Sequence, residues 1–235
     1  MECCLSPKEP DRFPLSLTTE ARRACLVRTH SKPWPGIHGA RVGVLRTVPT
    51  GPRLSASAGP YIGDEIAAAE KKGGTTAGAA ALVRLLETDH LQDQLAAVAW
   101  LRTQRFVRSD WIAVAGNSFG GIETVLGAER GTYCAAIDSA GGAQSWAQAP
   151  ELQSLMTRAV RNSTVPIFFF QAANDYDLSP SKTLSEAMKE AGKTFEMKIY
   201  SAYGKSVQEG HTFGYFGSSV WATDVFRFLD QHCTK

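Results

Sequence analysis

The sequence predicts an α/β fold in which helices cover both faces of a mostly parallel sheet. From residue 59 onward, short apolar runs alternate with segments whose apolar residues recur at helical spacing. Parallel strands that are buried on both faces read as continuous apolar runs, and helices connect them. The predicted strands span residues 111–115, 133–137, 165–172 and 195–200. The predicted helices span residues 64–72, 82–101 with an interruption near Thr88 and Asp89, 119–129, 149–162, 180–191 and 221–232, and residues 73–76 form a loop.

The first 58 residues have a different character. They carry Arg22-Arg23, scattered glycines and prolines at positions 33, 35, 49 and 52, and only residues 41–45 read as a strand. We therefore expect two parts. These are an atypical N-terminal segment over residues 1–58 and an α/β domain over residues 59–235, with the early N-terminal strands of the fold missing or altered.

The composition excludes several classes of protein. The chain has 235 residues, 43% of them hydrophobic and 20% charged, so one domain with a packed core is expected. A net charge of +2 does not indicate nucleic-acid or anionic-membrane binding, and no apolar run approaches the ~20 residues that span a bilayer. The start, MECCLSPKEPDRF, does not read as a signal peptide.

The cysteines favour a reducing compartment. Their number is odd and no C-x-x-C pair is present, which argues against a disulfide framework or a zinc site and favours the cytoplasm. Cys134 lies in an apolar run and is expected to be a buried thiol. The five cysteines are Cys3, Cys4, Cys25, Cys134 and Cys233.

One motif carries the chemistry. The segment Gly116–Gly121 reads GNSFGG, follows the apolar run WIAVA directly and precedes the helix-like IETVLGAER. This is the G-x-S-x-G pattern between a strand and a helix, in which a tight turn exposes the serine hydroxyl above the sheet edge. Small residues two before and two after Ser118 are expected to prevent clashes between strand and helix backbones. The pattern also occurs as an ordinary glycine-rich turn, but its context here predicts Ser118 as a nucleophile.

A serine nucleophile needs a base and an orienting acid, in the chain order serine, acid, histidine. Asp175 follows the predicted strand 165–172, where an orienting acid is expected, and Asp177 is the alternative. Aspartate in such a place also forms turns or caps helices. His211 lies after the last strand and before the last helix, which favours it as the base. The other histidines, less suitably placed, are His30, His38, His90 and His232.

The oxyanion of a tetrahedral intermediate needs hydrogen-bond donors. The backbone N–H of Phe119, directly after the nucleophile, is predicted to be one of them. The second donor normally comes from an early loop, often marked by His-Gly-Gly. Only His38-Gly39 resembles that mark here, and it is a weak match.

The residues after Gly59 resemble the dienelactone hydrolase-like branch of the α/β-hydrolase superfamily. The resemblance covers about three quarters of the chain and rests on GPYIGDEI at 59–66, AVAWLR at 97–102, AVAGNSFGGIETVLGAER at 113–130, FFFQAANDYDLSPSKTL at 168–184 and EGHTFGYFG at 209–217. It implies an α/β-hydrolase catalytic domain with a serine or cysteine nucleophile, an aspartate and a histidine, and with no metal or cofactor. By position these residues are Ser118, Asp175 and His211. The founding members use cysteine, so a serine here favours a general carboxylesterase over a true dienelactone hydrolase.

The resemblance fails before Gly59. The family places a strand, an oxyanion loop and a second strand ending in an Arg-Arg-Gly turn there, and none is visible. Suitable codons for VLRTVPTGPRLS at 44–55, read one base later, give FFVPYRRGHGS. We therefore hypothesise that the upstream region is a shifted reading frame that returns to register near residues 55–58. The coding DNA tests this, since one inserted or deleted base must restore the family strand.

The resulting prediction is a serine carboxylic-ester hydrolase that acts on small or short-chain esters through an acyl-enzyme. The expected partner is a small-molecule ester, with no nucleic acid and no membrane, and the oligomeric state is not predicted. Alternatives are a lactone or dienelactone hydrolase, a prolyl-oligopeptidase-like peptidase, and a homologue that keeps the fold without catalysis. So short a chain has no room for the propeller domain of the peptidases. Trp146, Phe119, Phe213 and Tyr215 are candidates for lining an apolar pocket, although core packing is the better explanation for each.

Overall fold

The computed structural model describes residues 24–27, 43–47, 62–105, 107–131 and 133–233. Most of the atypical N-terminal segment predicted over residues 1–58 lies outside these ranges, so the proposed domain division stays a prediction. His38, the weak candidate for the second oxyanion donor, and most of the stretch 44–55 also lie outside the described residues.

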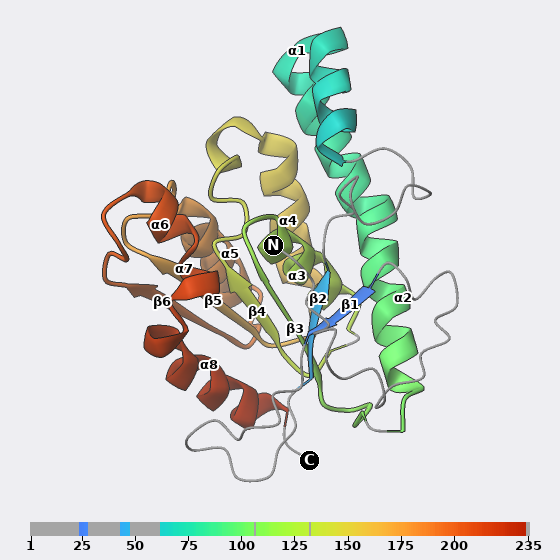
Figure 1. The fold of residues 1–235 in the computed structure, drawn as a ribbon, viewed down its shortest axis with the longest axis vertical. Coiled ribbons are helices and arrows are strands. Elements are labelled where there is room, and N and C mark those ends of the chain that lie inside the picture. Colours follow the sequence, from blue (N-terminus) through green and yellow to red (C-terminus); the bar gives the residue numbers. More distant parts are fainter. Residues whose placement is uncertain (1–23, 28–42, 48–61, 106, 132, 234–235) are drawn as a thin grey trace, which may run out of the picture.

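The strands form one six-stranded sheet in the order β1-β2-β3-β4-β5-β6 (Figure 1). Strands β2 to β6 run parallel, and β1 pairs antiparallel with β2 at the edge. The predicted α/β class and mostly parallel sheet are confirmed. The expectation of a single early strand is wrong, because a second one, too short to be visible as a pattern, pairs with β2. The strands are Ala24–Val27, Gly43–Thr47, Ile112–Asn117, Ala136–Ser139, Ile167–Ala172 and Phe195–Tyr200.

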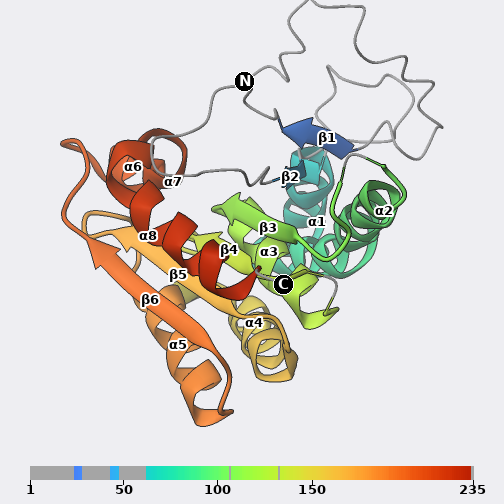
Figure 2. The ribbon, with the colours of Figure 1, turned by 90° about the horizontal axis from the view of Figure 1, so that it is seen from below.

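The helices lie on both faces of the sheet, as the apolar strands predict. In Figure 2, α8 lies on one side of the strands and α4 and α5 lie on the other. The helices are α1 Ile62–Leu85, α2 Leu91–Arg102, α3 Phe119–Glu129, α4 Pro150–Asn162, α5 Ser179–Glu190, α6 Val207–His211, α7 Phe213–Phe216 and α8 Ser218–His232, with a π-helical turn at Leu86–His90 and a 3-10 turn at Trp146–Gln148. No helix in the described ranges is both long enough and apolar enough to cross a bilayer.

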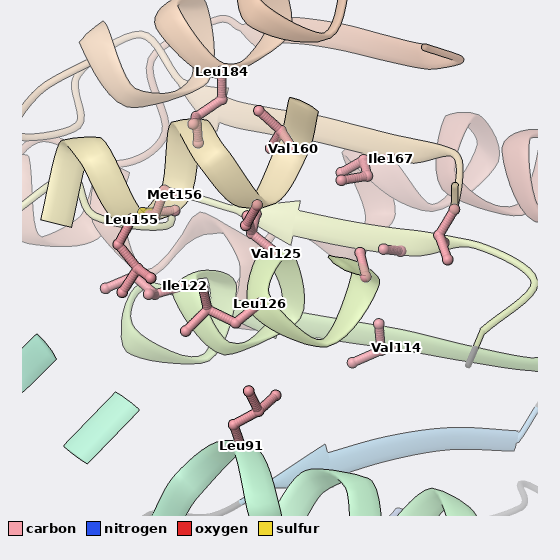
Figure 3. Packing of buried hydrophobic residues seen from close by; sticks show 14 of the residues in the cluster. Leu91, Val114, Ile122, Val125, Leu126, Leu155, Met156, Val160, Ile167 and Leu184 are labelled. Carbon is pink, nitrogen blue, oxygen red and sulfur yellow. The ribbon is translucent and has the colours of Figure 1, made fainter. Parts of the chain in front are cut away.

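Alternate residues of the central strands contribute their side chains to two apolar clusters, one on each face of the sheet. Val114 of β3 and Ile167 of β5 point to the helices α2 to α5, where they pack with Leu126 and Met156 (Figure 3). The neighbouring strand positions, including Phe168, point to the opposite face and pack against α7 and α8. This period of two gives each face of the sheet its own core.

Helix α1 is bent back on itself. Gly73 and Gly74 have non-helical backbone angles, and Gly74 has a φ of 73°. Glu65 and Arg84 form an ion pair of 3.0 Å, although 19 residues of straight helix would separate them by about 28 Å. The predicted break at these glycines is confirmed. However, the loop is shorter than the predicted 73–76, because Thr75 and Thr76 are helical.

A disulfide joins Cys134, just before β4, to Cys233 after α8, with their Cα atoms 5.1 Å apart. The prediction that Cys134 is a free buried thiol, and that the chain has no disulfide, is therefore wrong. An odd count and the lack of C-x-x-C say nothing about cysteines that the fold brings together over a separation of 99 residues. The cysteine pattern therefore no longer supports the expectation of a reducing compartment.

Candidate active site

Ser118 occupies a strained turn between β3 and α3. Its φ of 58° and ψ of −117° lie in a region that residues with side chains rarely adopt. A Cβ at position 116 would lie 2.0 Å from the carbonyl oxygen of Gly120, so glycine is required two residues before the serine. The expectation that a small residue is also required at position 120, two residues after the serine, is wrong. A Cβ at Gly120 would meet no described atom within 4 Å. The close contact belongs to Gly121, whose Cβ would lie 2.3 Å from Oδ1 of Asp138.

The backbone around Ser118 is fixed on both sides. Its N–H donates to the carbonyl of Ser139 in β4 at 2.9 Å, while its own carbonyl accepts from the N–H of Gly121 and of Ile122. Phe119 is the first helical residue, so its N–H lies at the positive end of α3 and has no intrahelical partner. The N–H of Phe119 donates to no acceptor among the described residues. Its use as an oxyanion donor stays a prediction.

The structure brings Ser118, His211 and Asp175 together in one chain of contacts. Nε2 of His211 lies 2.7 Å from Oγ of Ser118, and Nδ1 lies 2.7 Å from Oδ1 of Asp175. His211 is buried. Because an ionised carboxylate only accepts hydrogen bonds, Nδ1 carries the proton in this arrangement and Nε2 is left to accept from the serine hydroxyl.

Two further donors converge on the carboxylate of Asp175. The N–H of Tyr176 donates to Oδ1 at 2.7 Å, and Nε2 of Gln171 donates to Oδ2 at 2.8 Å. Asp177, the alternative acid, is used elsewhere, because its Oδ1 accepts from the N–H of Ser179 at the start of α5. The structure therefore brings Asp175, and not Asp177, to His211.

His211 is presented by a short helix rather than by the expected loop. It is the last residue of α6, which begins with a capping box in which Ser206 and Glu209 satisfy each other's backbone N–H groups. Backbone and side-chain donors from Lys205 and Ser206 hold the pKa of Glu209 below its usual range. The side chain of Asn174 ties this segment to the loop that carries Asp175, since it bonds the backbone of both Tyr203 and Ser206.

Several residues around the site were not predicted from the sequence. The ring of Tyr176 packs edge-on to His211, with centroids 5.2 Å apart, and it stays 48% exposed. Gln171 bonds the carboxylate of Asp175 and Asn117 bonds the backbone of His211, while Asn174 bonds the backbone of Tyr203 before α6. Gln171 had one available signal, because a polar residue in the otherwise apolar run IFFFQA is unusual for a buried strand.

Two other buried carboxyls have raised pKa values. Burial raises the pKa of Asp138 to about 7, although the N–H of Gly141 bonds its Oδ1 and opposes the rise. Burial, with a smaller contribution from the charge of Asp93, raises the pKa of Glu123 to about 8. Oδ2 of Asp138 and both carboxyl oxygens of Glu123 have no donor among the described residues.

The family now follows from comparison with known proteins. A model of the dienelactone hydrolase family matches residues 61–215. The chain belongs to the dienelactone hydrolase family. The match spans the strand-to-helix turn with Ser118, the loop with Asp175 and the helix with His211, and it agrees with the resemblance seen in the sequence. A search of curated proteins found no match.

Solved structures share the fold at low identity. A puromycin-hydrolyzing peptidase of Mycobacterium tuberculosis is 17% identical, with a TM-score of 0.52 over 64% of this chain and 26% of that one. An acylaminoacyl peptidase of Pyrococcus horikoshii is 18% identical, with a TM-score of 0.52 over 68% and 31%. Dipeptidyl peptidase 4 of Porphyromonas gingivalis is 21% identical, with a TM-score of 0.50 over 62% and 23%. The chain thus spans less than a third of these proteins, and the likeness establishes the fold alone.

Proposed function

We propose that the protein is a serine carboxylic-ester hydrolase that acts on small or short-chain esters. The observation that supports this most directly is the unbroken series of contacts from Asp175 through His211 to Ser118, with the serine on a strained turn at a helix start. Membership of a hydrolase family supports the same reaction class. In this proposal Ser118 is the nucleophile, His211 the general base and Asp175 the orienting acid.

The reaction follows from these positions. His211 takes the hydroxyl proton on Nε2 as Oγ of Ser118 attacks the ester carbonyl carbon. Asp175 stabilises the imidazolium that forms, and the N–H of Phe119 donates to the oxyanion. The intermediate collapses as His211 returns its proton to the leaving alcohol, which leaves an acyl-enzyme on Ser118. His211 then deprotonates a water that attacks the acyl carbon, and protonation of Oγ releases the acid.

An acyclic ester is favoured as substrate over a dienelactone. The family's founding members use cysteine, and this chain has serine at that position. A lactone is a cyclic ester that reacts through the same steps, so it remains the second candidate, supported by the family match.

Hydrolysis of p-nitrophenyl acetate and butyrate tests the proposal. Wild type and Ser163→Ala are expected to hydrolyse both esters, and Ser118→Ala is expected to lose roughly 10³-fold or more of kcat/KM. Ser163 is a suitable control because it is a buried serine that bonds Ala128 and Val165 away from the site. Equal activity in wild type and Ser118→Ala would overturn the assignment. A small lactone and an aminoacyl anilide, assayed in parallel, separate the ester, lactone and peptide alternatives.

A further inference from the structure

We propose that Asn117 and Ser139 are positioning residues that hold the backbone of His211 in place relative to Ser118. The inference rests on the proposed function, because it gives the two residues a role in that same reaction. The two side chains bond each other, the amide of Asn117 donates to the carbonyl of His211, and the carbonyl of Ser139 accepts from the N–H of Ser118. They therefore contact the backbone of the base and of the nucleophile rather than the reacting side-chain atoms.

The first observation is the bond to His211. This residue ends α6, so its carbonyl has no partner within the helix. Nδ2 of Asn117 donates to that carbonyl at 3.1 Å, across a separation of 94 residues, in a buried setting. The residue next to the nucleophile thus bonds the backbone of the base directly. Removal of the amide would leave a buried carbonyl without a donor.

The second observation is that Ser139 orients this amide. Asn117 and Ser139 face each other in the parallel register of β3 and β4, and Oγ of Ser139 donates to Oδ1 of Asn117 at 2.9 Å. The opposite amide orientation would set Oδ1 against the carbonyl oxygen of His211, which is repulsive. The carbonyl of Ser139 also accepts the N–H of Ser118. One residue of β4 therefore fixes both the nucleophile and the group that holds the base.

The third observation is the close packing of α7 on this pair. A Cβ at Gly214 would lie 2.4 Å from Oδ1 of Asn117 and 2.4 Å from Oγ of Ser139. The backbone at Gly214 is therefore in direct contact with both side chains. Because His211 and Gly214 are three residues apart, the pair touches the segment that carries the base at two points.

The expected role is in the rate of proton transfer rather than in substrate binding. A displacement of a reacting group by about 1 Å can lower a rate by roughly 100-fold. Loss of the Asn117 amide frees the carbonyl of His211 and lets Nε2 move from Oγ of Ser118. Loss of the Ser139 hydroxyl leaves the amide in place but less well oriented, so a smaller effect is expected.

The test measures how fast a fluorophosphonate labels Ser118, together with kcat and KM for p-nitrophenyl butyrate. We expect Asn117→Ala to lower the labelling rate and kcat by roughly 30- to 100-fold, and Ser139→Ala by roughly 3- to 10-fold, with KM changed less than about twofold. Ser163→Ala is the matched control for Ser139→Ala, since it also removes a buried hydroxyl that bonds backbone groups. Its labelling rate should equal that of wild type even if its melting temperature falls.

A second readout does not depend on activity. The Nδ1 proton shared by His211 and Asp175 should give a far-downfield proton NMR signal in wild type and in Ser163→Ala. We expect that signal to broaden or shift in both Asn117→Ala and Ser139→Ala, and the second variant suffices should the first not fold. Wild-type labelling together with unchanged rates and an unchanged signal in the variants overturns the inference alone. Absence of labelling in wild type overturns the proposed function, and the inference with it.

Discussion

The carboxyl ends of two neighbouring strands each bury an aspartate, but in different surroundings. Near the end of β5, Asp175 is 8% exposed and accepts from a backbone N–H, an amide and an imidazole. In β4, Asp138 is 1% exposed and accepts from one backbone N–H. Hydrogen bonds to a carboxyl favour its charged form, whereas burial favours the neutral one. The carboxyl that contacts His211 therefore accepts from three donors, whereas the one with a single donor is deeper and has a raised pKa.

The two ends of the sheet also differ in chemistry. The carboxyl end carries the linked polar side chains of Ser118, His211 and Asp175, which hydrogen bonds from residues of β3, β4, β5 and α6 hold in place. The amino end near β4 is tied to α8 by the disulfide Cys134–Cys233. Hydrogen bonds thus lie at the end of the sheet where the proposed reaction moves protons, and the disulfide lies at the other end.

Replacement of each aspartate by asparagine should give the largest difference between the two residues, measured as kcat/KM. Asp175→Asn is expected to lower kcat/KM for p-nitrophenyl butyrate by roughly 10³- to 10⁴-fold, because the amide donates to His211 and favours the wrong tautomer. Asp138→Asn should stay close to wild type when assayed at or below about pH 6, because an amide of the same shape then replaces an acid that is mostly neutral. Comparable losses of kcat/KM in both variants would show that the two aspartates do not differ in their role in catalysis.

The pH dependence of stability should show the next largest effect. In the folded state Asp138 keeps its proton up to about pH 7, whereas in the unfolded state it loses the proton near the ordinary aspartate pKa of 3.8. The folded state therefore binds more protons between these values, and the free energy of unfolding should fall as pH rises, by an amount on the order of 4 kcal/mol. Urea titrations from pH 4 to pH 9 measure this fall.

The same titrations can assign the fall to its two sources. Glu123 adds a second fall of similar size between pH 4.5 and about pH 8. Asp138→Asn should therefore remove about half of the slope below pH 7, and Glu123→Gln should remove the other half together with the fall that continues to about pH 8. Stability that rises with pH over this range would show that neither carboxyl is held neutral.

Removal of one donor from Asp175 should have an intermediate effect. Gln171→Leu deletes the bond to Oδ2 and a second bond to the carbonyl of Asp177. A hydrogen bond to a charged group contributes about 1.5 kcal/mol, so kcat/KM should fall roughly 10-fold. Gln94→Leu is the matched control, because Gln94 is buried and its amide has no partner among the described residues. The control should leave kcat/KM unchanged, and an equal loss in both variants would show that the bond to Asp175 is unimportant.

An exposed carboxylate supplies the smallest expected effect. Glu190 bonds Arg161, but their side chains are 55% and 49% exposed, so water screens the pair. Glu190→Gln should change the free energy of unfolding by less than about 0.5 kcal/mol in urea titration. A larger loss would mean that a donor alone, without burial, determines what a carboxylate contributes.

Local signals predicted the elements that they mark directly. Helix α3 begins and ends at the predicted residues because the G-x-S-x-G turn fixes its start, and β6 is confirmed at 195–200. Strand β4 was predicted at 133–137 but spans Ala136–Ser139, since Tyr133 and Cys134 are apolar without being in the strand. Helices α6 and α7 are too short to show helical spacing, so a loop was predicted there.

Only those residues of the candidate site that follow a characteristic order along the chain could be predicted from the sequence. Ser118, Asp175 and His211 stand in the chain order that the chemistry requires, and the structure brings them together. Nothing in the sequence marks the bond between Asn117 and Ser139, because it depends on which residues two parallel strands place side by side. The disulfide was missed for the same reason, since its two cysteines meet only in the folded chain.

The disulfide has a consequence for proteolysis. It closes residues 134–233 into a covalent ring, which contains Asp175 and His211 but excludes Ser118. A protease that cuts once inside this ring, for example after the exposed Lys205, leaves both pieces attached to each other. The nicked chain would run as a single species on a denaturing gel without reductant and as two species with it.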